Sequence, residues 1–133
     1  MRTSHFTGET EVSSNNLATE FRFSEEEKAK PVAEKVAKIL SNSPVVLFMK
    51  GNASMPQCGF SANSVGILSS LGVPFTTFNI LTDPEVRQGL KEISNWPTYP
   101  QVYVNKTLIG GNDILTEMHE SGELKQMVNA LAK

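Results

Sequence analysis

The sequence predicts an α/β fold in which a four-stranded mixed sheet is flanked by helices. Two short apolar segments, 44–49 and 73–80, enclose a segment of helical spacing at 60–71. A strand–helix–strand order implies two parallel strands joined by a right-handed crossover. Further along, the segment 101–109 alternates between apolar and polar residues on both sides of Asn105-Lys106. This pattern predicts a hairpin that adds two antiparallel strands to the sheet.

We divide the chain at residue 24. Residues 1–23 are rich in Ser, Thr, Asn and Glu and have no sustained hydrophobic period, so we expect a flexible N-terminal tail. Residues 24–133 are expected to form one folded domain. Ser24 is followed by three glutamates, which is typical of a helix start with a cap and an acidic first turn. We expect this helix to run to about residue 41, although Pro31 could instead mark its true start.

Caps and breakers place the remaining elements. The dipeptide Asp83-Pro84 predicts a capped helix that runs to about residue 93. Helical sequence follows the hairpin at 114–119 and again at 123–132, and Gly122 is expected to break or bend it. The segment 73–80 carries a proline near its start, which predicts a position at an edge of the sheet at that end.

Composition excludes several classes of function. The formal net charge is −2 and the basic residues are not clustered, which argues against nucleic-acid binding. The apolar runs are far shorter than the roughly 20 residues that a membrane span requires, so we expect no membrane association. The chain has one cysteine, which excludes an intramolecular disulfide and a zinc site built from several thiolates of one chain.

That cysteine, Cys58, lies in the loop between the expected strand 44–49 and the expected helix 60–71, just before the helix begins. The N-terminus of a helix favours an anion because its first N–H groups are unpaired and its dipole is positive there. A thiolate with a nearby cation, for which Lys50 is the candidate, would therefore be stabilised. The alternative is an inert structural thiol, but such thiols lie in apolar surroundings, whereas Cys58 follows a loop rich in Gly, Pro, Ser and Asn.

Three further features could belong to the same site, and each has a plain structural alternative. The tripeptide Thr98-Tyr99-Pro100 could hold a cis proline that exposes backbone groups to an extended peptide, or it could simply start a strand. The segment 110–113 offers close backbone approach at its glycines and a cap at Asp113, or only a turn. Arg87 and Lys91 share one helical face, which is usually a solvated face.

Together these motifs resemble one family. The residues Lys50-Gly51, the run from Pro56 to Ser61, the run from Trp96 to Gln101 and the run from Gly110 to Asp113 are similar, in this order and spacing, to monothiol glutaredoxins of the CGFS class. The resemblance extends from about residue 34 to residue 132. It implies a thioredoxin fold, which matches the order of elements predicted above. A single-domain chain of this class resembles the mitochondrial type.

The resemblance also implies a site. Cys58 would be the reactive thiol and a ligand of an iron–sulfur cluster. Cys58 would also contact glutathione, together with ten further residues: Lys50, Phe60, Arg87, Lys91, Thr98, Tyr99, Pro100, Gly111, Asn112 and Asp113. Within this set the three cations would gather around the glycine carboxylate of glutathione, and Tyr99 would pair its backbone with the cysteine of glutathione. Asn112 and Asp113 would hold the γ-glutamyl end, with Asp113 facing its ammonium. Phe60 and Trp96 would shape the groove.

Two positions limit the thiol chemistry of this chain, and one of them, Asn112, departs from the pattern of many relatives. Ser61 stands where a dithiol relative has its second cysteine, and Asn112 stands where many relatives carry a cysteine. No internal disulfide is therefore possible. A [2Fe–2S] cluster needs four ligands, so the resemblance implies a cluster held by two chains, through Cys58 of each, and two glutathione molecules.

From this arrangement we expect a homodimer when a cluster is bound and a monomer otherwise. The implied function is transfer of the cluster to apo-proteins, with apo iron–sulfur proteins, BolA-like proteins and assembly chaperones as partners. A monothiol thiol–disulfide oxidoreductase, at most weakly active, is the alternative, because one cysteine suffices for that route. The expected location is the mitochondrial matrix, with a plastid or the cytoplasm as alternatives.

Overall fold

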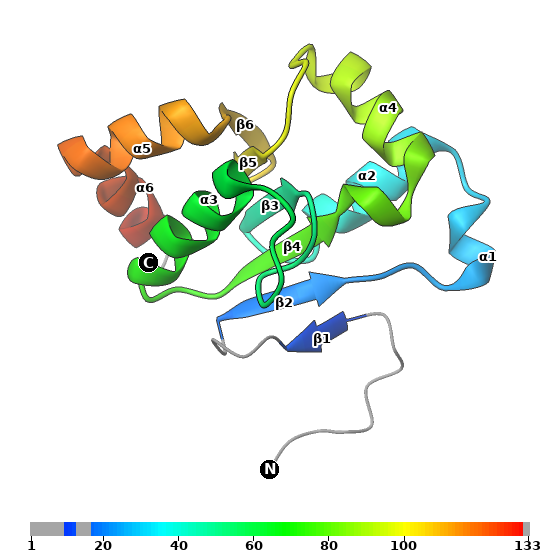
Figure 1. Ribbon diagram of the computed structural model, residues 1–133, viewed down its shortest axis with the longest axis horizontal. Coiled ribbons are helices and arrows are strands. Elements are labelled where there is room, and N and C mark those ends of the chain that lie inside the picture. The colour runs from blue at the N-terminus through cyan, green and yellow to red at the C-terminus, as the bar shows by residue number, and fades with distance from the viewer. Residues whose placement is uncertain (1–9, 13–16, 132–133) are drawn as a thin grey trace.

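The computed structural model describes residues 10–12 and 17–131. Its sheet lies between helices and has the strand order β1-β2-β4-β3-β5-β6 (Figure 1). The strands are β1 (Thr10–Val12), β2 (Ala18–Phe21), β3 (Val45–Met49), β4 (Phe75–Asn79), β5 (Gln101–Val104) and β6 (Thr107–Gly110). The helices are α1 (Glu25–Lys28), α2 (Val32–Leu40), α3 (Gly59–Ser70), α4 (Pro84–Ser94), α5 (Asn112–Ser121) and α6 (Glu123–Leu131), with a 3₁₀ turn, η1 (Ile80–Thr82), after β4.

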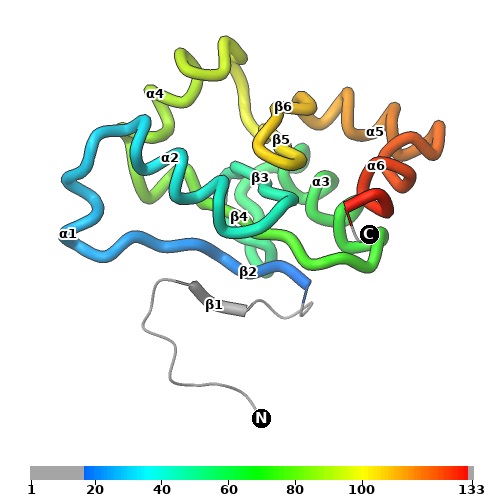
Figure 2. Tube along the Cα trace, turned by 180° about the vertical axis from the view of Figure 1, so that it is seen from behind, coloured from blue at the N-terminus to red at the C-terminus, as the bar shows by residue number. Residues whose placement is uncertain are grey.

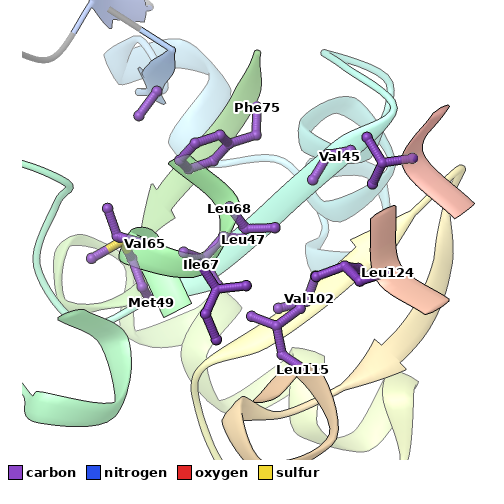
Figure 3. Packing of buried hydrophobic residues seen from close by; sticks show 12 residues of the cluster. Val45, Leu47, Met49, Val65, Ile67, Leu68, Phe75, Val102, Leu115 and Leu124 are labelled. Atoms are coloured by element: carbon purple, nitrogen blue, oxygen red, sulfur yellow. The ribbon is translucent and has the colours of Figure 1, made fainter. Parts of the chain in front are cut away.

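The central strand β3 is buried on both faces, and its alternating side chains belong to two separate cores. Val45, Leu47 and Met49 point toward α3, α5 and α6, where they pack with residues that include Leu68 and Leu115 (Figure 3). Because successive side chains of a strand point to opposite faces, this one strand supports both helical layers.

The second core lies on the other face of the sheet. Val46 and Phe48 of β3 pack there with residues of α2 and α4, among them Ile39 and Leu90. The Phe48 ring lies edge-on to the ring of Phe78, with 6.0 Å between centroids. Figure 1 shows α2 and α4 on the right and α3, α5 and α6 on the left. The two helical layers thus cover both faces of the sheet.

The four strands predicted from the sequence are present in the predicted arrangement. β3 and β4 are parallel and joined through α3, while β5 and β6 are antiparallel. The hairpin turn is formed by Asn105 and Lys106, whose φ angles of 53° and 69° suit the positive-φ turns that match the twist of a hairpin. The predicted mixed sheet is therefore confirmed in its core.

The sheet is wider than predicted, and the boundary placed at residue 24 is wrong. β2 pairs with β4 in parallel, and β1 pairs with β2, so β4 lies inside the sheet rather than at the edge (Figure 2). Phe21 is only 3% exposed, and its ring lies 4.9 Å from Phe23 and 6.5 Å from Phe78. The four residues of β2 are too few to show a hydrophobic period in the sequence. Their burial depends on pairing with β4, which lies far along the chain. The rest of the expected tail, at 1–9 and 13–16, lies outside the described residues.

The helix expected over 24–41 is two helices. Ser24 and Glu27 form a capping box at the start of α1, as the sequence predicts. Pro31 then takes an extended conformation, with ψ of 148°, and α2 begins after it, so the alternative start near Pro31 is the correct one. A proline has no N–H to donate and disfavours a helical residue before it.

An ion pair joins α2 to the start of α4. Lys35 Nζ lies 2.7 Å from Asp83 Oδ2 and 2.9 Å from the carbonyl oxygen of Lys28. The Lys35 side chain is 1% exposed. The other oxygen of Asp83 accepts the Val86 N–H at 3.1 Å and so caps α4, as predicted. The spacing of α2 gives no sign that one of its lysines is buried.

Among the described residues, none of the helices is long and apolar enough to cross a membrane.

Candidate functional site

Cys58 is the N-cap of α3. Its backbone is extended, and its Sγ accepts a hydrogen bond from the Ser61 N–H at 3.4 Å. The thiol is neither deeply buried nor fully exposed, and it has no disulfide partner. The position at the start of a twelve-residue helix confirms the placement predicted from sequence. A helix N-terminus stabilises the thiolate over the thiol.

Ser61 connects this thiol to the preceding loop. Its side chain is fully buried, its Oγ accepts the Lys50 N–H at 3.1 Å, and the same Oγ lies 3.5 Å from Cys58 Sγ. A hydroxyl has two lone pairs and one proton, so Ser61 can accept from the Lys50 N–H and still donate its proton to a thiolate. The sequence identified Ser61 only as the position of a missing cysteine, so this contact is a functional feature that sequence analysis missed.

The pKa of Cys58 reflects opposing effects. Partial burial raises the pKa of the thiol, but hydrogen bonds from the Ser61 hydroxyl and from the N–H groups of Ser61 and Phe60 lower it, and so does the charge of Lys50. The net result is a pKa below the ordinary value for cysteine. The thiolate is the nucleophilic and metal-binding form, so Cys58 has the properties of a reactive cysteine.

The loop between Lys50 and Cys58 is held by backbone and side-chain contacts. Gly51 has a φ of 88°, and a Cβ built on it would lie 2.5 Å from the Met55 carbonyl oxygen, so only glycine fits there. The Asn52 Oδ1 accepts the Met55 N–H at 2.8 Å, and its Nδ2 lies 3.3 Å from Glu20 of β2. The N-terminal strand β2 therefore contacts the loop that precedes the thiol.

A groove of about 410 Å³ lies beside this loop. It is lined by Lys50, Phe60, Arg87, Lys91, Trp96, Pro97, Thr98, Tyr99, Pro100, Gly111, Asn112, Asp113 and Ile114. Ten of the eleven site residues expected from the resemblance are in this list, and Trp96 is there as expected. Cys58 is not among the lining residues, but Lys50 at the start of its loop and Phe60 in the first turn of α3 are. Pro97 and Ile114 are the lining residues that sequence analysis missed, and each adjoins a motif that it identified.

The charges in the groove are distributed asymmetrically. Three cations, Lys50, Arg87 and Lys91, face one acidic lining residue, Asp113. Lys50 comes from the loop after β3, whereas Arg87 and Lys91 come from α4. A ligand with more negative than positive groups would complement this lining.

Tyr99 connects two walls of the groove. The Tyr99-Pro100 peptide bond is cis, so a plain strand start with a trans proline is excluded. The buried Tyr99 hydroxyl donates a hydrogen bond to the Arg87 carbonyl oxygen at 2.8 Å. Burial raises the pKa of Tyr99, so its hydroxyl keeps its proton and remains a donor. This contact ties α4, with its two cations, to the segment before β5.

The wall formed by α5 differs in one respect from the expectation. The N-cap of α5 is Gly111, not Asp113, and Asp113 lies in the first turn. A Cβ built on Gly111 would lie 3.3 Å from both the Pro100 carbonyl oxygen and Trp96 Nε1. Gly111 therefore lets the two walls of the groove approach each other closely.

Comparison with known proteins agrees with this geometry. The Glutaredoxin family model matches residues 45–109. The chain is 52% identical to an uncharacterized monothiol glutaredoxin of Synechocystis over 94 residues, which are 71% of this chain and 88% of that protein. This chain belongs to the monothiol glutaredoxins. Its single thiol at Cys58 is the feature that the name describes.

A second curated protein and a solved structure are also similar to this glutaredoxin. It is 51% identical to the mitochondrial monothiol glutaredoxin-5 of Saccharomyces cerevisiae over 92 residues, 67% of this chain and 61% of that longer protein. The solution structure of reduced poplar apo GrxS14 superposes with a TM-score of 0.68 at 46% identity, covering 77% of this chain and 94% of that one. The predicted thioredoxin fold is thereby confirmed.

Proposed function

We propose that the groove of this glutaredoxin binds glutathione and that Cys58 and the bound glutathione together hold a [2Fe–2S] cluster for transfer to apo-proteins. The observation that supports this proposal most directly is the position of Cys58, whose pKa is lowered, next to a groove with three cations and one carboxylate. Glutathione has two carboxylates and one ammonium, which complement that set of charges.

The donor set of one chain fits a shared cluster. Among the described residues there is no group of three or more His, Cys, Asp and Glu side chains that could hold a metal. Cys58 is the only thiol of the chain. A [2Fe–2S] cluster requires four ligands, so two chains and two glutathione thiols would supply the set. Lys50, Arg87 and Lys91 would orient each glutathione by its carboxylate, and Ser61 would keep Cys58 deprotonated.

The partners follow from this arrangement. The protein would be a monomer without the cluster and a homodimer with it, and the recipients would be apo iron–sulfur proteins. Half of the ligands would be exchangeable small molecules, which favours release of the cluster to a recipient. We propose the mitochondrial matrix as its location, which is compatible with the 51% identity to a yeast relative named as mitochondrial.

Anaerobic reconstitution with iron, sulfide and glutathione tests the proposal. We expect a coloured dimer on size exclusion, with about two irons and two sulfides per two chains, formed only when glutathione is present. The Cys58→Ser variant should stay colourless and monomeric while its circular dichroism and unfolding midpoint remain those of the native chain. A Cys58→Ser variant that retains as much iron as the native chain would refute the proposal.

The lowered pKa of Cys58 also favours a second function, that of a thiol–disulfide oxidoreductase. In this route the Cys58 thiolate attacks the glutathione sulfur of a glutathionylated protein, so that a Cys58–glutathione disulfide forms and the protein thiolate leaves. A second glutathione thiolate then attacks that disulfide, which gives glutathione disulfide and regenerates the Cys58 thiolate. A colourless monomer that reduces glutathionylated proteins would favour this function over cluster transfer.

A further inference from the structure

Glu20 is a buried carboxylate that contacts the thiol loop, which we define as residues 50–57. It belongs to β2 and is only 6% exposed. Its Oε1 accepts a hydrogen bond from Asn52 Nδ2 at 3.3 Å and lies 3.4 Å from Arg22 Nη2. Figure 1 shows the loop before α3 reaching β2. β2 lies outside the residues 45–109 that the family model matches, so this contact comes from the N-terminal part of this chain.

The contacts of Asn52 fix the orientation of its amide. The Asn52 Oδ1 accepts the Met55 N–H at 2.8 Å and the Ser54 hydroxyl at 3.1 Å. A backbone N–H can only donate, so Asn52 must present its oxygen to Met55 and its NH₂ group to Glu20. The Met55 N–H also lies 3.1 Å from the Asn52 carbonyl oxygen. Asn52 therefore closes the tip of the thiol loop and at the same time fastens that tip to β2.

The base of the same loop leads into the site. The Gln57 N–H donates to the Lys50 carbonyl oxygen at 2.8 Å, so the two ends of the loop are joined. The Lys50 N–H in turn donates to Ser61 Oγ at 3.1 Å. The Lys50 charge and the Ser61 hydroxyl both lower the pKa of Cys58. A displacement of the loop would therefore disturb two groups that act on the thiol.

We propose that Glu20 is a positioning residue, which holds the thiol loop through Asn52 and so keeps Lys50 at the groove and beside Cys58. This inference rests on the proposed function, in which Lys50 orients glutathione and Cys58 reacts as a thiolate. Glu20 is not one of the residues that line the groove, so it acts only through the loop. The property that Asn52 requires of it is a hydrogen-bond acceptor, which a glutamine also provides and an alanine does not.

Two substitutions of Glu20 separate the acceptor from the rest of the side chain. In Glu20→Ala we expect alkylation of Cys58 by iodoacetamide at neutral pH to slow about threefold and its profile to move to higher pH, because the thiolate fraction falls. Glutathione affinity, measured by calorimetric titration, should also fall about threefold. Glu20→Gln should restore both to the native values. Thr19→Ala is the matched control, since Thr19 lies on the same strand with its side chain on the opposite face.

Double variants test the path through the loop. Asn52→Ala should shift the alkylation profile at least as much as Glu20→Ala, and the combination should be no worse than Asn52→Ala alone, because residues that act through one contact are not additive. The effect of Glu20→Ala should likewise shrink when Lys50 is already alanine.

Three results would overturn the proposal: a native profile in Glu20→Ala, an equal loss in Glu20→Ala and Glu20→Gln, or additive losses with Asn52→Ala. The proposed function fails separately. A native chain that forms no glutathione-dependent cluster would refute that function, whereas a shifted alkylation profile in Glu20→Ala, rescued by Glu20→Gln, would still support the positioning role of Glu20.

Discussion

The Ser61 hydroxyl lies 3.5 Å from Cys58 Sγ while it accepts the Lys50 N–H at 3.1 Å. This arrangement orients a buried donor toward the thiol and joins the start of the loop to its end. The residue at the position of a dithiol relative's second cysteine is thus also one that lowers the pKa of Cys58.

Replacing Ser61 should make Cys58 less acidic. In Ser61→Ala the hydroxyl donor is lost, and the pKa of Cys58 should rise because burial, which raises it, is opposed by fewer hydrogen bonds. The rate of alkylation by iodoacetamide follows the thiolate fraction, so its pH profile should move to higher pH. Ser64→Ala is the matched control, since Ser64 is equally buried on the same helix but bonds to Asn112. A profile that does not move in Ser61→Ala would exclude the hydroxyl as a cause.

Lys50 should act on both the thiol and the ligand. The Lys50→Ala substitution removes a cation from the groove and a charge that lowers the pKa of Cys58. We expect glutathione affinity to fall about tenfold and the alkylation profile to move to higher pH, with little change in unfolding. Lys125→Ala, on the exposed face of α6, should leave both unchanged. Native-like glutathione affinity in Lys50→Ala would remove Lys50 from the site.

Gly51 should be intolerant of any side chain. Gly51→Ala places a Cβ 2.5 Å from a backbone oxygen at a φ of 88°, so it should cost more than the roughly 1–2 kcal/mol that a left-handed backbone alone requires. Gly66→Ala in α3 is the control, because nothing lies within 4 Å of its Cβ and alanine favours a helix by about 1 kcal/mol. Urea unfolding should therefore move in opposite directions for the two variants, and a stable Gly51→Ala would contradict the loop geometry.

The buried lysine should contribute to stability. Lys35→Met leaves Asp83 without its partner in a buried position, and removing one member of such a pair costs about 3–5 kcal/mol. Lys38 on the same helix pairs with Glu27 but is half exposed, so Lys38→Met should cost less than about 1 kcal/mol. Chemical denaturation measures both. Equal effects in the two variants would show that burial of Lys35 is not what makes its ion pair important.

Phe21 tests whether β2 belongs to the domain. Phe21→Ala should destabilise the fold by about 3–5 kcal/mol, the usual cost of removing a buried aromatic ring. Phe60 is 62% exposed at the groove, so Phe60→Ala should leave the free energy of unfolding nearly unchanged and weaken glutathione binding instead. If Phe21→Ala has the same denaturant midpoint of unfolding as the native chain, residues 18–21 contribute nothing to the core.

The sequence by itself determined the elements whose signals are local. The position of Cys58 before a helix, the capping box at Ser24, the cap at Asp83 and the hairpin at Asn105 each depend on residues within a few positions of one another. Their physical causes are backbone conformation and short-range hydrogen bonds. The groove residues were also predicted from local signals, because the resemblance to a known family depends on short motifs and their order along the chain.

Only the tertiary structure decided which side chains meet across long separations. The burial of Lys35 depends on Asp83, the contact of β2 with the thiol loop depends on Glu20 and Asn52, and Asn112 of α5 meets Asn63 of α3. Each of these polar residues is ordinary on the surface of a protein, and its role follows only from the partner that the fold brings to it. A buried polar group must find such a partner, but the sequence does not say which one.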